Sequence, residues 1–346
     1  MARKLAKIIG LLLGLLIVAL IGFIFLSGPS LPAATNDILD EVLSEELPSF
    51  VTGTSGTVQS DGYDIWYEAR ESSQDSTQGT FLLFMGISND ALGWPEPFLQ
   101  QLTDGGYRLV RFDYRGTGMS DWADDWQEKP YDLSNLSADA MAILDMLEIE
   151  KVHVLGVSLG GMVAQQFSLQ YPARTISLIS MMSTGDAYDG TIPPVSAETA
   201  FSLVRSSLKY GLLPGERNKI KVHLAARIVL RGEADYELDM KTTAQQVLYN
   251  HRHRNGYNPH ASAQHHEATR LSGSRYEALQ SSAIPTLLIH GKQDPFIPVE
   301  HSMKLDSLIP NSTALLLDNM GHDLPESKRE EVVNEILGFV QGLEEY

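Results

Sequence analysis

The sequence predicts an α/β fold in which helices flank a mostly parallel central sheet. From Tyr63 onward, short apolar runs alternate with segments of helical periodicity, which is the pattern of strands joined by crossover helices. One of the runs leads directly into Ser158 and then into a helix. Between about 186 and 281 the pattern is helical and rich in charge, so this segment is expected to be an insertion.

The individual elements follow from the spacing of apolar residues. The predicted strands are 63–69, 80–85, 107–113, 151–157, 175–182, 285–290 and 313–317. Helices are expected over 92–102, over 159–170, and around an apolar face made by Leu136, Ala140, Ile143, Leu144 and Leu147. A closing helix carries Val333, Ile336, Val340 and Leu343 on one side.

Length and composition indicate one globular catalytic domain. A chain of 346 residues has room for one large α/β domain. Its formal charge of -18 argues against a nucleic-acid partner, because phosphate binding needs clustered Lys and Arg. The sequence has no cysteine, which excludes disulfides, thiolate catalysis and cysteine-ligated zinc.

The N-terminal segment is interpreted as a transmembrane anchor over 1–29. Arg3, Lys4 and Lys7 precede an uncharged apolar run over 8–26, and such a run of about 19 residues is as long as a bilayer core is thick. The lipid bilayer is therefore a predicted partner, and the positive-inside rule places the catalytic domain on the periplasmic or extracytoplasmic side. A cleaved signal, which would give a secreted protein, is the alternative.

The rest of the chain divides at about residue 60. Residues 30–60 are predicted to be a tether with one short helix around 37–44. Residues 61–346 form the predicted catalytic domain, with a helical cap inserted at about 186–281.

The strongest chemical signal is the G-x-S-x-G sequence from Gly156 to Gly160, placed between a predicted strand and a predicted helix. A sharp strand-to-helix turn forces its serine into a strained backbone conformation and leaves no room for bulky neighbours, which explains the two glycines. Ser158 is therefore predicted to be a nucleophile held exposed above the sheet.

A serine nucleophile needs a base and an acid that orients it, and both are expected on loops after later strands. Asp294 follows the predicted strand 285–290 and is assigned as the acid, whereas His322 follows strand 313–317 and is assigned as the base. Asp186, after the strand that ends near 182, is a competing candidate for the acid.

Two backbone N–H groups are candidates for an oxyanion hole. Leu159 begins the helix after the nucleophile, where the N–H has no partner inside the helix. Ile87, made accessible by the preceding Gly86, is the candidate in the loop after strand 80–85. Neither a metal nor a cofactor is expected: His251, His253, His260, His265 and His266 match no zinc-binding spacing and are interpreted as polar surface.

Several blocks of the sequence resemble the α/β-hydrolase family, and within it the group of aclacinomycin methylesterase. They are 83–86, 91–95, 111–115 with Gly118 and Ser120, 153–162, 289–295 and 321–325, in a similarity that covers roughly 63–343. The resemblance implies the same Ser, Asp and His, a helical cap, no cofactor and, more loosely, ester hydrolysis. The sequence departs from the family at Met85-Gly86, where His-Gly is commoner, and in its N-terminal segment.

The leading hypothesis is hydrolysis of a small-molecule carboxylic ester through an acyl-enzyme on Ser158. The same three residues also serve cofactor-free perhydrolysis, acyl transfer or hydrolysis of a carbon–carbon bond, and these stay open. The alternative to an enzyme is a membrane-anchored binding protein without catalytic activity.

Overall fold

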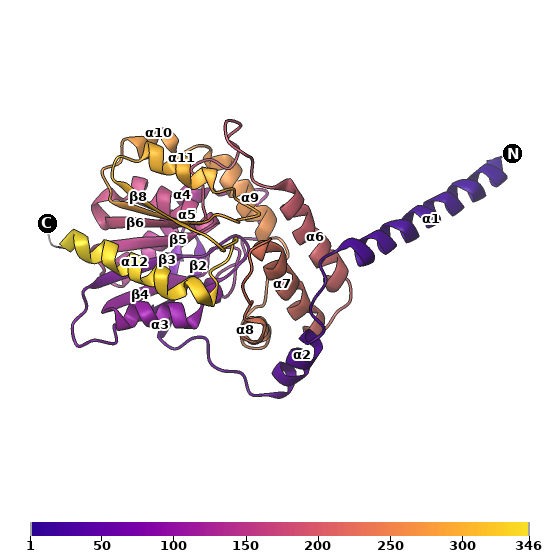
Figure 1. Ribbon diagram of the computed structural model, residues 1–346, viewed down its shortest axis with the longest axis horizontal. Helices are drawn as coiled ribbons and strands as arrows, with labels where there is room; N and C mark the ends of the chain where they lie inside the picture. Colours follow the sequence, from indigo (N-terminus) through magenta and orange to yellow (C-terminus); the bar gives the residue numbers. More distant parts are fainter. Residues whose placement is uncertain (1, 345–346) are drawn as a thin grey trace.

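The computed structural model describes residues 2–344 and shows a central sheet with helices on both faces (Figure 1). The sheet has 8 strands in the order β1-β2-β4-β3-β5-β6-β7-β8. β2 is antiparallel to β1 and to β4, and all other neighbours are parallel, which confirms the predicted mostly parallel sheet. The strands are β1 Thr54–Ser60, β2 Tyr63–Arg70, β3 Gly79–Phe84, β4 Tyr107–Phe112, β5 Val152–Val157, β6 Thr175–Met181, β7 Thr286–Gly291 and β8 Ser312–Leu317.

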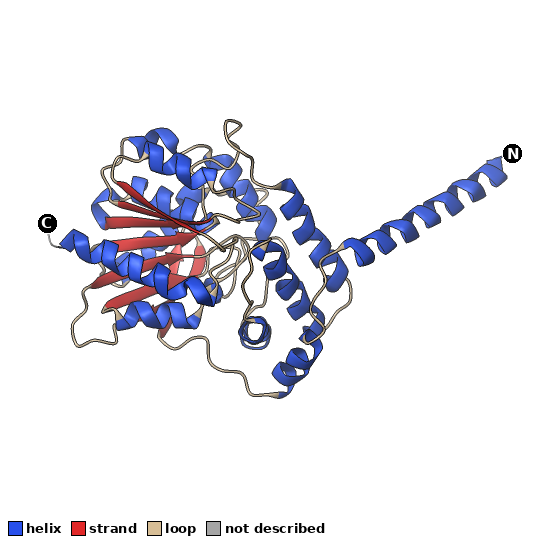
Figure 2. Cartoon of the chain, viewed as in Figure 1, coloured by secondary structure: helices blue, strands red, loops and turns tan. Residues whose placement is uncertain are grey.

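Helices cover both faces of the sheet (Figure 2), and the central strands β3 and β7 are therefore buried along almost their whole length. Successive side chains of a strand point to opposite faces. In β3, Leu82 and Phe84 join the core beneath the helices 133–146 and 159–170, whereas Phe81 and Leu83 join the core beneath the helices 96–104 and 326–344. The flanking helices are α3 Glu96–Asp104, α4 Leu133–Met146, α5 Leu159–Gln170, α11 Glu300–Leu308 and α12 Glu326–Glu344.

Between β6 and β7 the chain leaves the sheet and forms a helical insertion. Its helices are α6 Ala197–Gly211, α7 Glu216–Arg231, α8 Met240–His253, α9 Ala261–Ser272 and α10 Tyr276–Gln280. No described residue between β6 and β7 belongs to a strand, in agreement with the sequence pattern. In Figure 1, α6, α7 and α8 lie between the sheet and the N-terminal helix α1, Ala2–Ser27.

The segment expected to be a tether is partly built into the fold. Its helix α2, Thr35–Ser44, buries Leu39 and Val42 completely against α7 and α8 of the insertion. β1 also lies in this segment and pairs along its whole length with β2. β1 was not predicted, because Val58 is its one large apolar residue.

Helix α1 extends away from the remainder of the molecule (Figure 1). The large apolar side chains of α1 whose exposure the structure describes are more than half exposed, among them Leu11 at 66%, Leu16 at 68% and Val18 at 67%. A membrane span needs both length and sustained apolarity, and no helix in the described part of the chain combines them sufficiently to cross a bilayer. The transmembrane helix predicted over 1–29 is therefore not supported.

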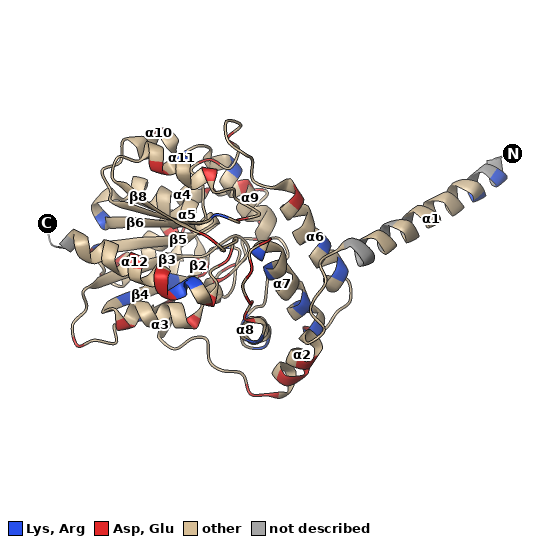
Figure 3. Ribbon diagram, viewed as in Figure 1, with Lys and Arg blue, Asp and Glu red and all other residues tan. Residues whose placement is uncertain are grey.

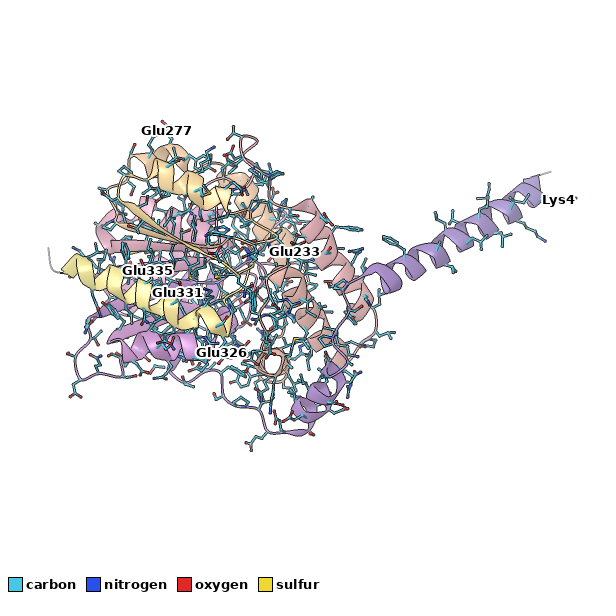
Figure 4. All side chains as sticks on the ribbon, in the orientation of Figure 1. Lys4, Glu233, Glu277, Glu326, Glu331 and Glu335 are labelled. Atoms are coloured by element: carbon cyan, nitrogen blue, oxygen red, sulfur yellow. The ribbon has the colours of Figure 1, made fainter. Side chains whose placement is uncertain are left out.

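Charged residues are spread over the helices, with both signs interspersed (Figure 3). On the last helix, Glu326, Glu331 and Glu335 are exposed (Figure 4). These three carboxylates carry negative charge at the surface of the molecule.

Candidate active site

Ser158 occupies the turn between β5 and α5, as the sequence predicted. Its φ of 57° and ψ of -120° are strained for a residue with a side chain. A Cβ on Gly156 would lie 2.0 Å from the Gly160 carbonyl oxygen, and one on Gly160 would lie 2.0 Å from the Phe84 carbonyl oxygen. The glycines are therefore needed for close backbone approach on both sides of the serine.

One detail of that prediction is wrong, because Ser158 is not open to solvent. The residue is only 6% exposed. A sequence motif reports the local turn and carries no information on what later segments place above it. The hydroxyl is thus in a largely dehydrated position, where electrostatic interactions are stronger than in water.

Ser158, His322 and Asp294 form a hydrogen-bonded line. The Ser158 Oγ lies 3.0 Å from His322 Nε2, and His322 Nδ1 lies 2.6 Å from Asp294 Oδ2. Three loops that are far apart in the sequence, after β5, β7 and β8, bring these side chains together at one end of the sheet.

Asp294 is buried, and its carboxylate has hydrogen-bond partners. Its Oδ1 accepts hydrogen bonds from the backbone N–H groups of Phe296 and Ile297, at 2.8 and 2.9 Å. Burial by itself raises the pKa of this carboxyl, but the neighbouring His322 and His290 more than offset burial and hold the pKa of Asp294 well below its usual range. Asp294 is therefore ionised at neutral pH.

His290 is part of this site, and the sequence analysis missed it. Its Nε2 lies 3.3 Å from Asp294 Oδ2 and 2.8 Å from the Ile297 carbonyl oxygen, and its Nδ1 lies 2.6 Å from Ser302 Oγ. His290 lies within β7, and from the sequence it was placed in a strand and in a family-like block without being given a role. Its position four residues before Asp294, at the carboxyl end of a strand, was the available signal.

The two candidate oxyanion donors belong to segments that lie next to Ser158. Leu159 is the first residue of α5, so its N–H has no acceptor within the helix. The loop that contains Ile87 passes close to Ser158, since a Cβ on Gly86 would lie 3.6 Å from the Ser158 Cβ. The Tyr114 hydroxyl donates to the Met85 carbonyl at 3.0 Å and supports the start of this loop.

The competing acid does not join the line. The Asp186 carboxylate accepts the backbone N–H of Tyr188 at 2.8 Å, which is a local turn. His322 has Asp294 as its carboxylate partner. The geometry therefore favours Asp294 over Asp186.

The interpretation of all five insertion histidines as polar surface is wrong for His265. This residue is completely buried, and its Nδ1 accepts the backbone N–H of Ser88 at 3.2 Å. The contact joins segments 177 residues apart, so no local pattern could reveal it. Within residues 2–344, no group of three or more potential ligands is arranged to hold a metal ion.

The insertion also contacts the loop that carries His322. The backbone N–H of His322 donates to the Leu230 carbonyl at the end of α7, at 2.8 Å. Arg227 of the same helix donates to Asp323 Oδ2 from Nη2 at 2.6 Å and from Nε at 3.1 Å. The Phe296 ring meets the His322 ring edge to face at 5.4 Å.

Comparison with known proteins identifies the family to which this site belongs. A family model of the alpha/beta hydrolase fold matches residues 79–328, which include Ser158, Asp294 and His322. The chain belongs to the α/β-hydrolase family.

Individual relatives of this α/β-hydrolase are hydrolases of different kinds. Rhodomycin D methylesterase of Streptomyces peucetius is 28% identical over 285 residues, which cover 78% of this chain and 92% of the relative. A 2-hydroxy-6-oxononadienedioate/2-hydroxy-6-oxononatrienedioate hydrolase of Pseudomonas putida is 28% identical over 266 residues, covering 76% and 87%. This α/β-hydrolase is thus an enzyme with hydrolase activity, and esterases are among its relatives.

A solved structure extends the similarity to the full length of the α/β-hydrolase described here. A bacterial membrane phospholipase A matches with a TM-score of 0.63 at 20% identity, covering 100% of both chains. At this identity the likeness shows a shared fold.

Proposed function

We propose that the chain hydrolyses a carboxylic ester through an acyl-enzyme on Ser158, with His322 as general base and Asp294 as the group that orients it. The observation that supports this assignment is the unbroken line from Ser158 Oγ through His322 to Asp294, with contacts of 3.0 and 2.6 Å. The methylesterase relative supports the same reaction class.

In the first half of the reaction, the Ser158 Oγ attacks the ester carbonyl carbon while its proton moves to His322 Nε2. The negative charge on the carbonyl oxygen is stabilised by the Leu159 and Ile87 N–H groups. The intermediate then expels the alcohol, which takes the proton from His322. Asp294 keeps Nδ1 protonated throughout, so that Nε2 is free to accept and return that proton.

In the second half, water replaces the alcohol. It gives a proton to His322 Nε2 and attacks the acyl carbon through the same oxyanion arrangement. The bond to Ser158 Oγ breaks, the proton returns to Oγ, and the carboxylic acid leaves. We propose that residues 186–281 act as a cap over the site and surround the acyl or alcohol part of the substrate.

Hydrolysis of a carbon–carbon bond is the second candidate, because a relative of similar identity is named for a dienedioate hydrolase. Perhydrolysis and acyl transfer use the same acyl-enzyme with a different acceptor. The experiment that separates ester cleavage from carbon–carbon cleavage measures p-nitrophenyl esters of graded chain length with wild-type protein and Ser158→Ala.

We expect turnover of at least one of these esters by the wild-type protein and loss of turnover in Ser158→Ala. Failure of the wild-type protein on every ester would reject a general esterase and favour a carbon–carbon substrate. Equal activity of the two proteins would reject Ser158 as nucleophile, and binding without any turnover would indicate a non-catalytic role.

The exposed apolar residues of α1 need a covering, and we propose that a lipid surface provides it. Arg3, Lys4 and Lys7 precede these residues and suit anionic headgroups. The side of the membrane on which the catalytic domain lies stays a prediction. Co-flotation with vesicles of phosphatidylglycerol and phosphatidylethanolamine tests the contact: the full chain should float and a chain lacking residues 1–30 should not. Equal behaviour of the two proteins would contradict it.

A further inference from the structure

A histidine of the insertion is hydrogen bonded to the loop that carries the proposed oxyanion donor. His265, on α9, is completely buried, and its Nδ1 accepts the backbone N–H of Ser88 at 3.2 Å. Ser88 follows Ile87 directly. The insertion therefore contacts this loop at the residue directly after the one whose N–H is proposed to stabilise the oxyanion.

The imidazole of His265 is held in the form that accepts this bond. Burial lowers the pKa of His265 to about 4, against a smaller opposing effect of the Arg115 carbonyl, so the ring is neutral at pH 7. Because Nδ1 accepts the Ser88 N–H, the single ring proton lies on Nε2. The Tyr114 ring, which meets the His265 ring edge to face at 5.4 Å, fixes the orientation of the imidazole.

Ser88 is in a conformation that needs such support. Its φ is 63°, in the left-handed region that residues with a Cβ rarely adopt. A strained conformation of this kind persists where the surroundings hold it in place. Two groups hold this loop from either side of Ile87: Tyr114 binds the Met85 carbonyl at 3.0 Å, and His265 binds the Ser88 N–H.

We propose that His265 is a positioning residue for the oxyanion hole: by holding Ser88, it aims the Ile87 N–H at the oxygen that becomes negative in the transition state. This inference rests on the proposed ester hydrolysis. The insertion then has a second task besides enclosing substrate, since one of its side chains completes the support of the catalytic loop. Displacement of α9 would release the Ser88 N–H and weaken the oxyanion hole even with Ser158 and His322 in place.

The test compares three substitutions that differ in where they place a hydrogen-bond acceptor. Asn carries its amide oxygen near the position of the imidazole Nδ1, Gln carries it near Nε2, and Leu has none. His265→Asn should therefore retain the bond to Ser88, whereas His265→Gln and His265→Leu should lose it. His266→Gln is the matched control, because His266 is the exposed neighbour on the same helix.

The readout is the ratio of kcat/KM for the best p-nitrophenyl ester to that for its thionoester, in which sulfur replaces the carbonyl oxygen. Sulfur is larger and a weaker acceptor, so well-placed N–H groups favour the oxygen ester. A variant that merely contains less folded protein loses both activities equally and keeps the ratio. Thermal unfolding of each variant measures the folded fraction independently.

We expect His265→Gln and His265→Leu to lower kcat for the oxygen ester by about 10- to 100-fold, with little change in KM and a smaller ester-to-thionoester ratio. His265→Asn and His266→Gln should stay within about threefold of the wild-type kcat and ratio. The Asn and Gln pair preserves the comparison if the Leu variant does not fold.

Unchanged ratios in all His265 variants, or equal losses in the Asn and Gln variants, would overturn the positioning role. These outcomes presuppose a wild-type protein that turns over the oxygen ester. A wild-type protein inactive on every ester would instead reject the proposed function, and with it the oxyanion hole that His265 is proposed to support.

Discussion

Replacing Asp294 by Asn should remove most of the activity while leaving the fold intact, and the structure determines how the new amide is oriented. Asp294 Oδ1 accepts two backbone N–H groups, from Phe296 and Ile297, at 2.8 and 2.9 Å. In Asp294→Asn these donors retain the amide oxygen, so the NH₂ group takes the place of Oδ2, 2.6 Å from His322 Nδ1. Two N–H groups cannot face each other, so Nδ1 must become the acceptor.

The consequence is the wrong tautomer at the nucleophile. With Nδ1 accepting, the ring proton lies on Nε2 and points at Ser158 Oγ, where no proton can then be accepted. The equivalent loss in serine hydrolases lowers kcat by about 10⁴-fold, which corresponds to about 5 kcal/mol of activation free energy. We expect a decrease of this size in kcat at pH 7, with KM nearly unchanged because Asp294 does not reach the substrate.

The assay is steady-state hydrolysis of the best p-nitrophenyl ester, with thermal unfolding of the same preparation as the control for folding. The two backbone hydrogen bonds survive in the variant, so its melting temperature should stay close to that of the wild-type protein. A folded Asp294→Asn enzyme that keeps more than about a tenth of the wild-type kcat would refute the assignment of Asp294 as the orienting acid.

Three further predictions concern the fold around the site. Gly160→Ala places a Cβ 2.0 Å from the Phe84 carbonyl oxygen and should lower the free energy of unfolding, measured in urea, by about 3 kcal/mol or more. The control is Gly338→Ala, where the new Cβ meets nothing within 4 Å and the substitution should be neutral or stabilising. Equal effects of the two substitutions would contradict the close approach at Gly160. Burial raises the pKa of Asp113 to about 6, against the lowering effect of Arg254, so its folded form holds a proton that the unfolded chain releases near pH 4. The stabilisation contributed by protonated Asp113 is complete below about pH 4 and is lost as the pH rises to about 6. The free energy of unfolding of the wild-type protein should therefore fall relative to that of Asp113→Asn between these pH values. A constant difference between the two proteins would refute the raised pKa. Arg227→Met and Asp323→Asn should each lower kcat, and the double variant should show a coupling energy of about 1 to 2 kcal/mol in a double-mutant cycle, whereas additive losses would show that the ion pair does not support His322.

The hydrogen-bonded line from Ser158 through His322 to Asp294 could be predicted from the sequence because each of its members follows a local pattern. Ser158 stands between a buried strand and a helix, and Asp294 and His322 each follow an apolar run that ends at a loop. Parallel strands bring the ends of such runs to one edge of the sheet. Local patterns and the direction of the strands were therefore sufficient to bring these residues together in advance.

The remaining parts of the site depend on contacts between distant segments. His265 meets Ser88 across 177 residues, and His290 approaches Asp294 from within a strand whose pattern reports only burial. β1 is nearly free of large apolar residues and is recognised by its pairing with β2 alone. The N-terminal span was predicted from a run without charge, and it is not supported, since no helix among the described residues is long and apolar enough to cross a membrane.

Locating the residue to which a fluorophosphonate attaches tests most directly whether Ser158 is the nucleophile. We expect one adduct per chain, on the peptide that contains Ser158, with no adduct in Ser158→Ala and slow labelling in His322→Ala. An adduct on another residue, or equal labelling of the wild-type protein and Ser158→Ala, would contradict it.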